Sequence, residues 1–400
     1  MTSLWLLPIA IAIAASPVAA QIVPDASLPH NSVVTPNGNA LTIDGGTVSG
    51  SHLFHSFSEF SLPTGTEAFF NNAIGIDNIL TRITGERISN IDGVIRANGS
   101  TNLFLLNPNG IVFGPNARLD IGGSFFASAA ESIQFADGVE FSTNTEALPL
   151  LSVTAPVGLQ LGETPGAIAL RGHLSVPPGE TIALVGGEIT LAGGILEAPG
   201  GRIELVAAAD HNHTIGEPVN LAASGDITLS GGASANTSGE GGGSIAIGSD
   251  RFSLVEASTL QANTLGPVDG GSVDIRVRQL AIRDGSFIEA TATGTGSGAD
   301  INIRAAESAI VTGIGPQEAQ RIIAAALSGT LQPGERTTGL FASISGAGAA
   351  GNITIETDNL LLENGAFLSA STFSSGPGGD IRFRGDRIRI EESIVAAVVA

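Results

Sequence analysis

Two histidines that stand two positions apart are candidate metal ligands. His211 and His213 lie in the stretch Asp210-His211-Asn212-His213, and imidazole nitrogens and carboxylates are common ligands of Zn²⁺. On a strand, side chains two positions apart point to the same side. The neighbouring residues show no regular alternation of polar and apolar types, so we expect a loop. His211 and His213 are therefore only weak candidates, and we predict no metal site.

Several kinds of chemistry are excluded by residue types that the chain lacks. It contains no cysteine, which rules out thiol nucleophiles, thiolate zinc sites and disulfides. All 17 of its basic residues are arginines, so neither a phosphate-binding loop lysine nor a Schiff base is available. The net charge of −21 argues against nucleic acid as a partner, because no basic patch neutralises phosphates. We predict no cofactor.

In the C-terminal part of the chain, similar short segments recur at a fixed spacing. Five segments align without gaps, and their apolar fourth residues are Ile245, Val273, Ile301, Ile353 and Ile381. Three of the four intervals between them are 28 residues, and the interval from 301 to 353 is 52, one period plus a 24-residue insertion. A fixed period in this range is typical of a solenoid.

Apolar residues alternate within each repeat, as they do in strands with one buried face. The second repeat places Val273, Ile275, Leu280, Ile282 and Ile288 at such positions. Three short strands per repeat, with equivalent residues stacked, predict an all-β fold, namely a parallel β-helix. The insertion at about 313–339 begins its helix-forming stretch at Pro316 and ends it at Gly329, which predicts one short helix near 316–328.

The N-terminus has the features of an export signal. A short apolar run covers residues 4–15, and Val18 and Ala20 occupy the −3 and −1 positions of a signal-peptidase site. We predict a signal peptide over 1–20. The apolar run is too short to span a bilayer, and no later stretch is apolar enough, so we expect no transmembrane segment.

The most specific motif comprises Asn107, Pro108, Asn109, Gly110 and Ile111. Asn-Pro-Asn-Gly predicts a turn, because proline fixes φ at its second position and Asn-Gly readily takes positive φ. Apolar residues flank this turn on both sides and predict two strands.

His52 and His55 lie in another apolar segment upstream, where we expect structural roles.

The segments on both sides of this turn occur in an order that indicates a family resemblance. They are Leu53-Phe54-His55-Ser56-Phe57, Ala68-Phe69-Phe70-Asn71-Asn72, Arg82-Ile83-Thr84-Gly85, Ser89-Asn90-Ile91-Asp92-Gly93, the turn itself, and Gly122-Gly123-Ser124-Phe125-Phe126-Ala127-Ser128. In this order they resemble the N-terminal secretion domain of the filamentous haemagglutinin family, in the form found among cyanobacterial proteins. The resemblance covers about 21–240, and we expect β-helix repeats over 241–400.

This resemblance implies two-partner secretion. The chain would cross into the periplasm and be recognised by an outer-membrane β-barrel transporter with POTRA domains. Outside the cell it would fold into a right-handed parallel β-helix and act as an adhesin or haemagglutinin-like protein of the cell surface. The motif 107–111 would be needed for secretion. A second family motif, Asn-Pro-Asn-Leu, is absent from the corresponding interval 73–81. The receptor, a surface or a glycan, stays open.

An extracellular enzyme of the pectate-lyase type is the alternative, since such enzymes are also parallel β-helices. They need carboxylates clustered in one groove, whereas Asp274, Asp300, Asp358 and Asp380 are spread over several repeats and are expected at corners. We therefore predict no enzymatic activity. The chain stops within a repeat that begins at Gly378, which suggests a fragment of a longer protein, a truncated reading frame, or a solenoid that associates end to end.

Overall fold

The computed structural model describes residues 21–146, 151–209, 211–217, 224–328, 330 and 337–399. The predicted signal peptide, Asp210, and residues 329 and 331–336 of the predicted insertion lie outside these ranges.

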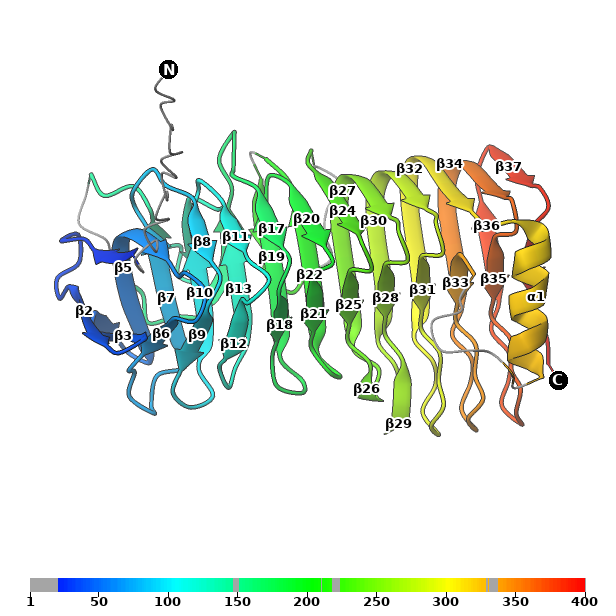
Figure 1. Cartoon of the computed structure of the whole chain (residues 1–400), viewed down its shortest axis with the longest axis horizontal. Helices are drawn as coiled ribbons and strands as arrows, with labels where there is room; N and C mark the ends of the chain where they lie inside the picture. Colours follow the sequence, from blue (N-terminus) through cyan, green and yellow to red (C-terminus); the bar gives the residue numbers. More distant parts are fainter. Residues whose placement is uncertain are drawn as a thin grey trace, which may run out of the picture.

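The described chain forms one elongated stack of parallel coils, a parallel β-helix (Figure 1). Each coil passes over three faces, and its strands pair with those of the coils before and after it. The largest sheet covers two faces, because β27 pairs with β22 through its first half and with β24 through its second. Its 19 strands are β1 (Gln21–Pro24), β4 (Thr47–Ser49), β5 (His52–Ser61), β7 (Asn78–Ile83), β8 (Ser89–Ile91), β10 (Asn102–Leu106), β11 (Ile111–Phe113), β13 (Phe125–Ser128), β17 (Ile168–Leu170), β19 (Thr181–Gly186), β20 (Ile189–Ala192), β22 (Arg202–Ala207), β24 (Asp226–Ser230), β27 (Ser244–Leu254), β30 (Ser272–Ile282), β32 (Asp300–Thr312), β34 (Ile353–Glu363), β36 (Ile381–Arg384) and β37 (Arg387–Ile390).

The third face is built from two sheets that follow one another along the stack. The five-stranded sheet contains β2 (Ser32–Asn37), β3 (Ala40–Gly45), β6 (Glu67–Phe70), β9 (Val94–Ala97) and β12 (Arg118–Asp120). The eight-stranded sheet contains β18 (His173–Ser175), β21 (Ile195–Glu197), β25 (Ser234–Asn236), β28 (Thr259–Gln261), β31 (Phe287–Glu289), β33 (Gly339–Phe341), β35 (Phe367–Ser369) and β38 (Ile394–Ala396). A small ladder of β26 (Gly239–Gly241) and β29 (Thr264–Val268) lies at one corner.

The strand register confirms the 28-residue repeat. Ile245 pairs with Val273, Val273 with Ile301, Ile301 with Ile353 and Ile353 with Ile381. One detail of the sequence prediction was wrong, because the first two strands of a repeat form one continuous strand, as in β27. The chain bends from one face to the next while it keeps pairing with the neighbouring coils, so no loop is needed there.

Apolar side chains fill the centre of the stack along its whole length. Parallel pairing places equivalent residues above one another, so aliphatic side chains of successive coils stack in columns. Aromatic rings take this role at the N-terminal end, where Phe57, Phe60 and Phe70 pack together. These side chains are at most 1% exposed, and burial of such residues is the main force that holds the coils together.

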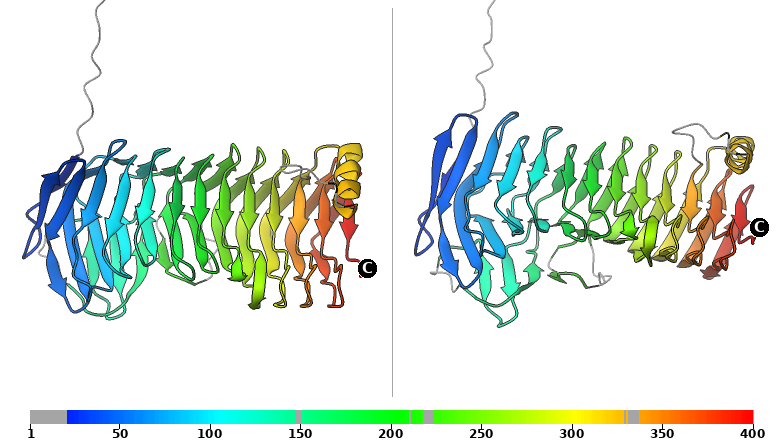
Figure 2. Two further views of the ribbon diagram at one scale, coloured as in Figure 1. Left: turned by 60° about the horizontal axis from the view of Figure 1, so that its bottom comes forward. Right: turned by 90° about the horizontal axis from the view of Figure 1, so that it is seen from below.

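A four-stranded antiparallel sheet lies outside the coils and was not predicted. It consists of β14 (Ser132–Phe135), β15 (Glu140–Ser142), β16 (Pro156–Gln160) and β23 (Asn212–Thr214). It branches from the body in the cyan-to-green part of the chain (Figure 2, right). A second apolar cluster fills the space beneath it and includes Phe54, Phe104, Phe126 and Phe141.

The predicted helical insertion is confirmed as α1 (Pro316–Leu327). Among the residues of α1 whose burial is described, Ala319 and Ile322 are buried, and they lie three positions apart and therefore on one side of the helix. A hollow lined by Ala319 and by Gly365, Glu392 and Ile394 shows that α1 lies against the corners of the last coils (Figure 1).

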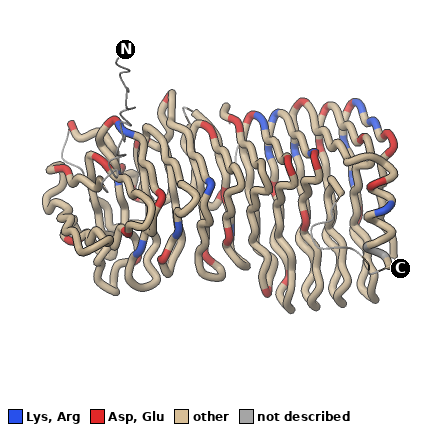
Figure 3. The backbone as a smooth tube through the Cα atoms, viewed as in Figure 1, with Lys and Arg blue, Asp and Glu red and all other residues tan. Residues whose placement is uncertain are grey.

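No helix within the described ranges is long and apolar enough to cross a membrane. Acidic residues are spread along the whole stack, while many of the arginines gather on the coils of its C-terminal half (Figure 3).

Candidate functional site

The motif 107–111 forms a turn between two strands, as its sequence predicts. It connects β10 to β11, and the Gly110 amide donates to the Asn107 carbonyl at 2.9 Å, which closes the turn. Gly110 has a φ of +110°, a backbone conformation that residues with a side chain rarely adopt. The last residue of the motif, Ile111, points into the core and is completely buried.

The Asn107 side chain is fully buried, and all its polar atoms have partners. Its amide group donates to the Arg87 carbonyl and to the Ser89 hydroxyl, each at 2.9 Å. Its Oδ1 accepts from the backbone and the side-chain nitrogens of Asn109, each at 3.0 Å. A buried amide is tolerated only with such partners, so Asn107 serves as an internal connector and presents no polar atom to solvent.

The same turn contacts the coil before it and the coil after it. Asn109 donates its side-chain amide to the Gly85 carbonyl of the earlier coil at 2.8 Å. On the other side, Gly166 donates to the Pro108 carbonyl at 2.8 Å and Ile111 donates to the Ala167 carbonyl at 3.0 Å. The approach is close, because a Cβ atom on Gly110 would lie 2.6 Å from the Ala167 carbonyl oxygen. The turn therefore fastens three coils together.

A buried arginine, Arg82, forms a second polar centre that sequence reasoning missed. It is 1% exposed and lies on β7. Its Nε donates to the Ser56 hydroxyl and one of its Nη groups to the Ser27 hydroxyl, each at 2.9 Å. Its other Nη donates to the Ser142 carbonyl of β15, and its guanidinium lies 4.6 Å from the centre of the Phe141 ring. Arg82 thus joins the first coils to the antiparallel sheet.

Asp25 compensates the charge of Arg82. It accepts hydrogen bonds from Ser27, from Ser56 at 2.7 Å and from Thr84 at 2.7 Å. Burial alone would raise the pKa of Asp25, but these hydrogen bonds outweigh it and hold the pKa below its usual value. Burial lowers the pKa of Arg82, and the nearby Asp25 carboxylate opposes that effect. Asp25 follows β1, so this network ties the first strand to the stack.

His52 and His55 have structural surroundings, as expected. His52 donates Nε2–H to the Thr154 carbonyl at 2.8 Å, and its Nδ1 lies 3.1 Å from the Asn78 amide. His55 is 1% exposed, and its Nδ1 lies 2.9 Å from the Ser32 hydroxyl. Burial lowers the pKa of His55 to about 3. Its ring packs against Phe57 and Phe70.

The expectation of a loop at the second histidine was wrong. His213 lies on β23, which pairs with β16, a partner more than fifty residues earlier in the chain. That pairing depends on the unpredicted antiparallel sheet, so local alternation could not indicate it. The His213 Nε2 lies 3.3 Å from a carboxylate oxygen of the buried Glu204. Within the described ranges, no three His, Cys, Asp or Glu residues are grouped to hold a metal ion.

The acidic residues of the repeats also differ from expectation in one place. Asp274 was expected at a corner but lies within β30, because the strand starts two residues before it and continues past it. Its carboxylate accepts from the Asn302 amide of the next coil at 3.1 Å.

Comparison with known proteins gives a family. A family model described as "TPS secretion domain" matches residues 20–313, more than half of the chain. This match extends past residue 240, and the domain boundary proposed there stays a prediction. No curated protein matches the chain significantly.

Two solved structures match as well. The HMW1 secretion domain from Haemophilus influenzae has 17% identity and a TM-score of 0.46, with 95% of this chain and 99% of that chain covered. A filamentous hemagglutinin secretion domain has 14% identity and a TM-score of 0.29, with 94% of this chain and 96% of that chain covered.

Proposed function

The chain belongs to the family of TPS secretion domains, and from this premise we propose that a POTRA-containing outer-membrane transporter exports it from the periplasm and that it acts at the surface as an adhesin. Membership makes the chain a secreted exoprotein of the two-partner type with a cognate outer-membrane transporter. The family is one of secretion domains and not of enzymes. The adhesive role, the POTRA domains and the periplasmic route are the parts that we add.

We further propose that the transporter reads the motif 107–111 while the chain is unfolded. The burial of Asn107 supports this: in the folded protein its side chain is 0% exposed and fully hydrogen-bonded. A transporter that bound this side chain in the folded state would have to break those bonds. An unfolded chain offers the same amide and carbonyl groups freely.

Folding outside the membrane then supplies a direction for export. Each coil that reaches the outside buries apolar residues on the coil already there, which is favourable by about 25 cal/mol per Å² of apolar surface. The folded coil cannot return through the pore. The motif therefore has two successive uses, first as a recognition segment and then as the turn that fastens three coils.

A secretion assay with matched variants tests this proposal. Wild-type chain, Asn107→Ala and Leu205→Ala are expressed in a bacterial host with and without the cognate transporter, and protein in the medium is quantified. Leu205 is a fully buried core residue, and Leu→Ala at such a site costs about 2–5 kcal/mol. Asn107→Ala removes four buried hydrogen bonds and costs about 2–4 kcal/mol.

We expect transporter-dependent secretion of the wild type. Asn107→Ala should reduce secretion strongly, while Leu205→Ala, of similar instability, should be secreted far better. Equal secretion of the two variants would show that only stability matters and that the motif is not read. Secretion without the transporter would exclude the export route.

A further inference from the structure

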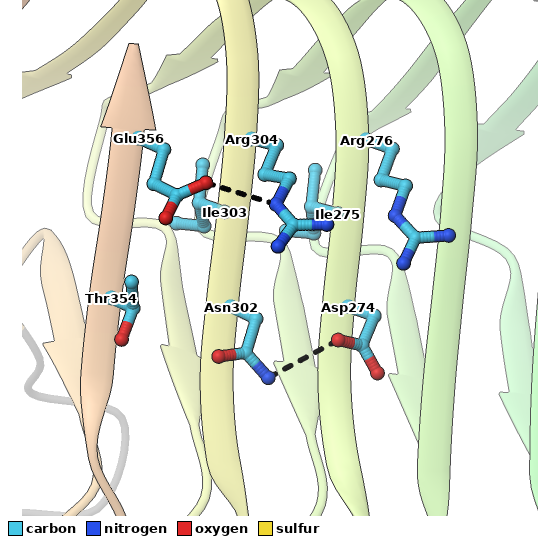
Figure 4. A pocket seen from close by; sticks show the side chains of 8 residues that line it. All are labelled: Asp274, Ile275, Arg276, Asn302, Ile303, Arg304, Thr354 and Glu356. Carbon is cyan, nitrogen blue, oxygen red and sulfur yellow. Dashed lines mark hydrogen bonds and ion pairs between the residues drawn. The ribbon is translucent and has the colours of Figure 1, made fainter. Parts of the chain in front are cut away.

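A polar groove crosses the outer side of three successive coils in the C-terminal half. It encloses about 200 Å³ on the outside of β30, β32 and β34 (Figure 4). Its lining residues are Asp274, Ile275, Arg276, Asn302, Ile303, Arg304, Thr354 and Glu356.

Strand geometry explains the shape of this groove. Residues two apart on a strand point to the same face, so each strand contributes one side chain to each wall. Asp274, Asn302 and Thr354 form one row, and Arg276, Arg304 and Glu356 form the other (Figure 4). The residues between them, such as Ile275 and Ile303, point into the core and are at most 1% exposed. The floor of the groove is therefore backbone.

The groove continues along the axis of the stack. A second hollow of about 430 Å³ shares Arg304 and Glu356 with the first and extends to Arg384 on β36. Neighbouring strands are about 4.8 Å apart, which is close to the length of one sugar residue in an extended polysaccharide. A linear glycan lying in the groove would therefore meet one pair of side chains, at equivalent strand positions of successive coils, at each sugar residue.

The two walls offer hydrogen-bond donors and acceptors in mixed order. The Asn302 side-chain NH₂ group donates to Asp274. The side-chain carbonyl oxygen of Asn302 points the other way, toward the strand that carries Thr354 (Figure 4). Among the described residues, Arg304 donates only its Nε–H, to Glu356 at 3.0 Å, although a guanidinium has five N–H donors. Glu356 also accepts from Arg384 at 2.9 Å. Sugar hydroxyls both donate and accept, so they match such walls.

The charges of the groove and of the whole chain limit which class of glycan could bind. Arginines and carboxylates are balanced along the groove, while the whole chain has a net charge of −21. A polyanionic glycan would be repelled by the protein as a whole. From the groove, its mixed walls and its spacing we propose that this face binds a linear, neutral polysaccharide. The proposal deepens the adhesive part of the proposed function and rests on it only in requiring that this face be outside the cell.

Isothermal calorimetry on the purified, refolded full chain tests the inference. The probes are cellohexaose, mannohexaose and chitohexaose as neutral oligosaccharides, with hexagalacturonate as the charged comparison. At least one neutral probe should bind, and the double variant Asn302→Ala/Arg304→Ala should weaken it about tenfold or more, since it removes charged and neutral hydrogen bonds. The protein is refolded without a transporter, so a failure of export cannot be mistaken for a failure to bind.

A matched control lies on the third face. Gln261 donates to Glu289 of the next coil at 3.1 Å, so Gln261→Ala/Glu289→Ala removes a similar ladder away from the groove and should bind the probe as wild type does. Circular dichroism and thermal unfolding confirm that both double variants fold. The inference is overturned if no neutral probe binds, if both variants bind equally, if only hexagalacturonate binds, or if the probe is cleaved.

Discussion

A buried amide is costly unless each of its polar atoms has a partner, because water no longer supplies hydrogen bonds. Asn107 meets this condition through contacts with Arg87, Ser89 and Asn109. The sequence predicted the turn from its Asn-Pro-Asn-Gly pattern, since those residues determine local backbone geometry. It could not predict that Asn107 points inward, because the partners of its side-chain NH₂ group, Arg87 and Ser89, belong to the preceding coil.

Gly110 provides a test of how closely the turn packs. Gly110→Ala would force a Cβ atom to within 2.6 Å of the Ala167 carbonyl at a φ of +110°, and we expect a loss of about 2–3 kcal/mol. Gly65→Ala is the control, since Gly65 also has a positive φ but open space around it. Urea unfolding should show a clearly larger loss at Gly110; equal losses would mean that the contact with Ala167 is unimportant.

His55 predicts a pH dependence of stability. Its pKa is about 3 when folded and 6.5 when unfolded, so between these values the unfolded chain binds a proton that the folded chain does not. Its stabilising contribution is intact above pH 6.5 and is lost as pH falls toward 3. From pH 7 to pH 5 the loss is about 2 kcal/mol.

The free energy of unfolding, measured in urea at pH 5, 6 and 7, checks this. His55→Gln should be less stable at pH 7 but should lose less stability on acidification than the wild type. His30→Gln changes a histidine at the surface and should keep the wild-type slope. A wild-type slope in His55→Gln would contradict the assignment.

At the scale of elements, the antiparallel sheet is the part of the fold that the sequence did not predict. Its strands pair residues such as Ser132 with Gln160 and Leu159 with His213, which are far apart and do not repeat. One signal was present: Leu103-Phe104-Leu105-Leu106 is apolar at every position. Such a run indicates burial on both faces, and Phe104 and Leu106 are indeed covered by this sheet. The insertion helix was predictable because its start and end signals are local.

Arg82 should decide whether this sheet stays attached. Arg82→Met removes the hydrogen bonds to Ser27, Ser56 and Ser142 and leaves the half-buried Asp25 without its nearby cation. We expect a loss of about 2–4 kcal/mol. Hydrogen exchange in β14 and β15 should accelerate. Arg87→Met is the control, because the Arg87–Glu59 ion pair is exposed on the arginine side and is worth at most about 1 kcal/mol. Unchanged exchange in Arg82→Met would refute this connecting role.

At the scale of the whole molecule, the repeat made the fold predictable. Residues 28 apart in the sequence stack above one another because parallel pairing demands the same register in each coil. The same architecture suits export of an unfolded chain, since each coil needs only the coil before it in order to fold. The absence of cysteine fits such a route, because no disulfide can lock the chain before it crosses the outer membrane.

A disulfide placed between two coils tests the central claim, export of an unfolded chain, most directly. Thr190 and Thr228 are paired residues on β20 and β24, and strand spacing of about 4.8 Å suits a disulfide. In cells with the cognate transporter, Thr190→Cys/Thr228→Cys should accumulate in the periplasm, and a reductant in the medium should restore its secretion. Each single variant should be secreted normally. Secretion of the oxidised double variant at the wild-type level would contradict the account.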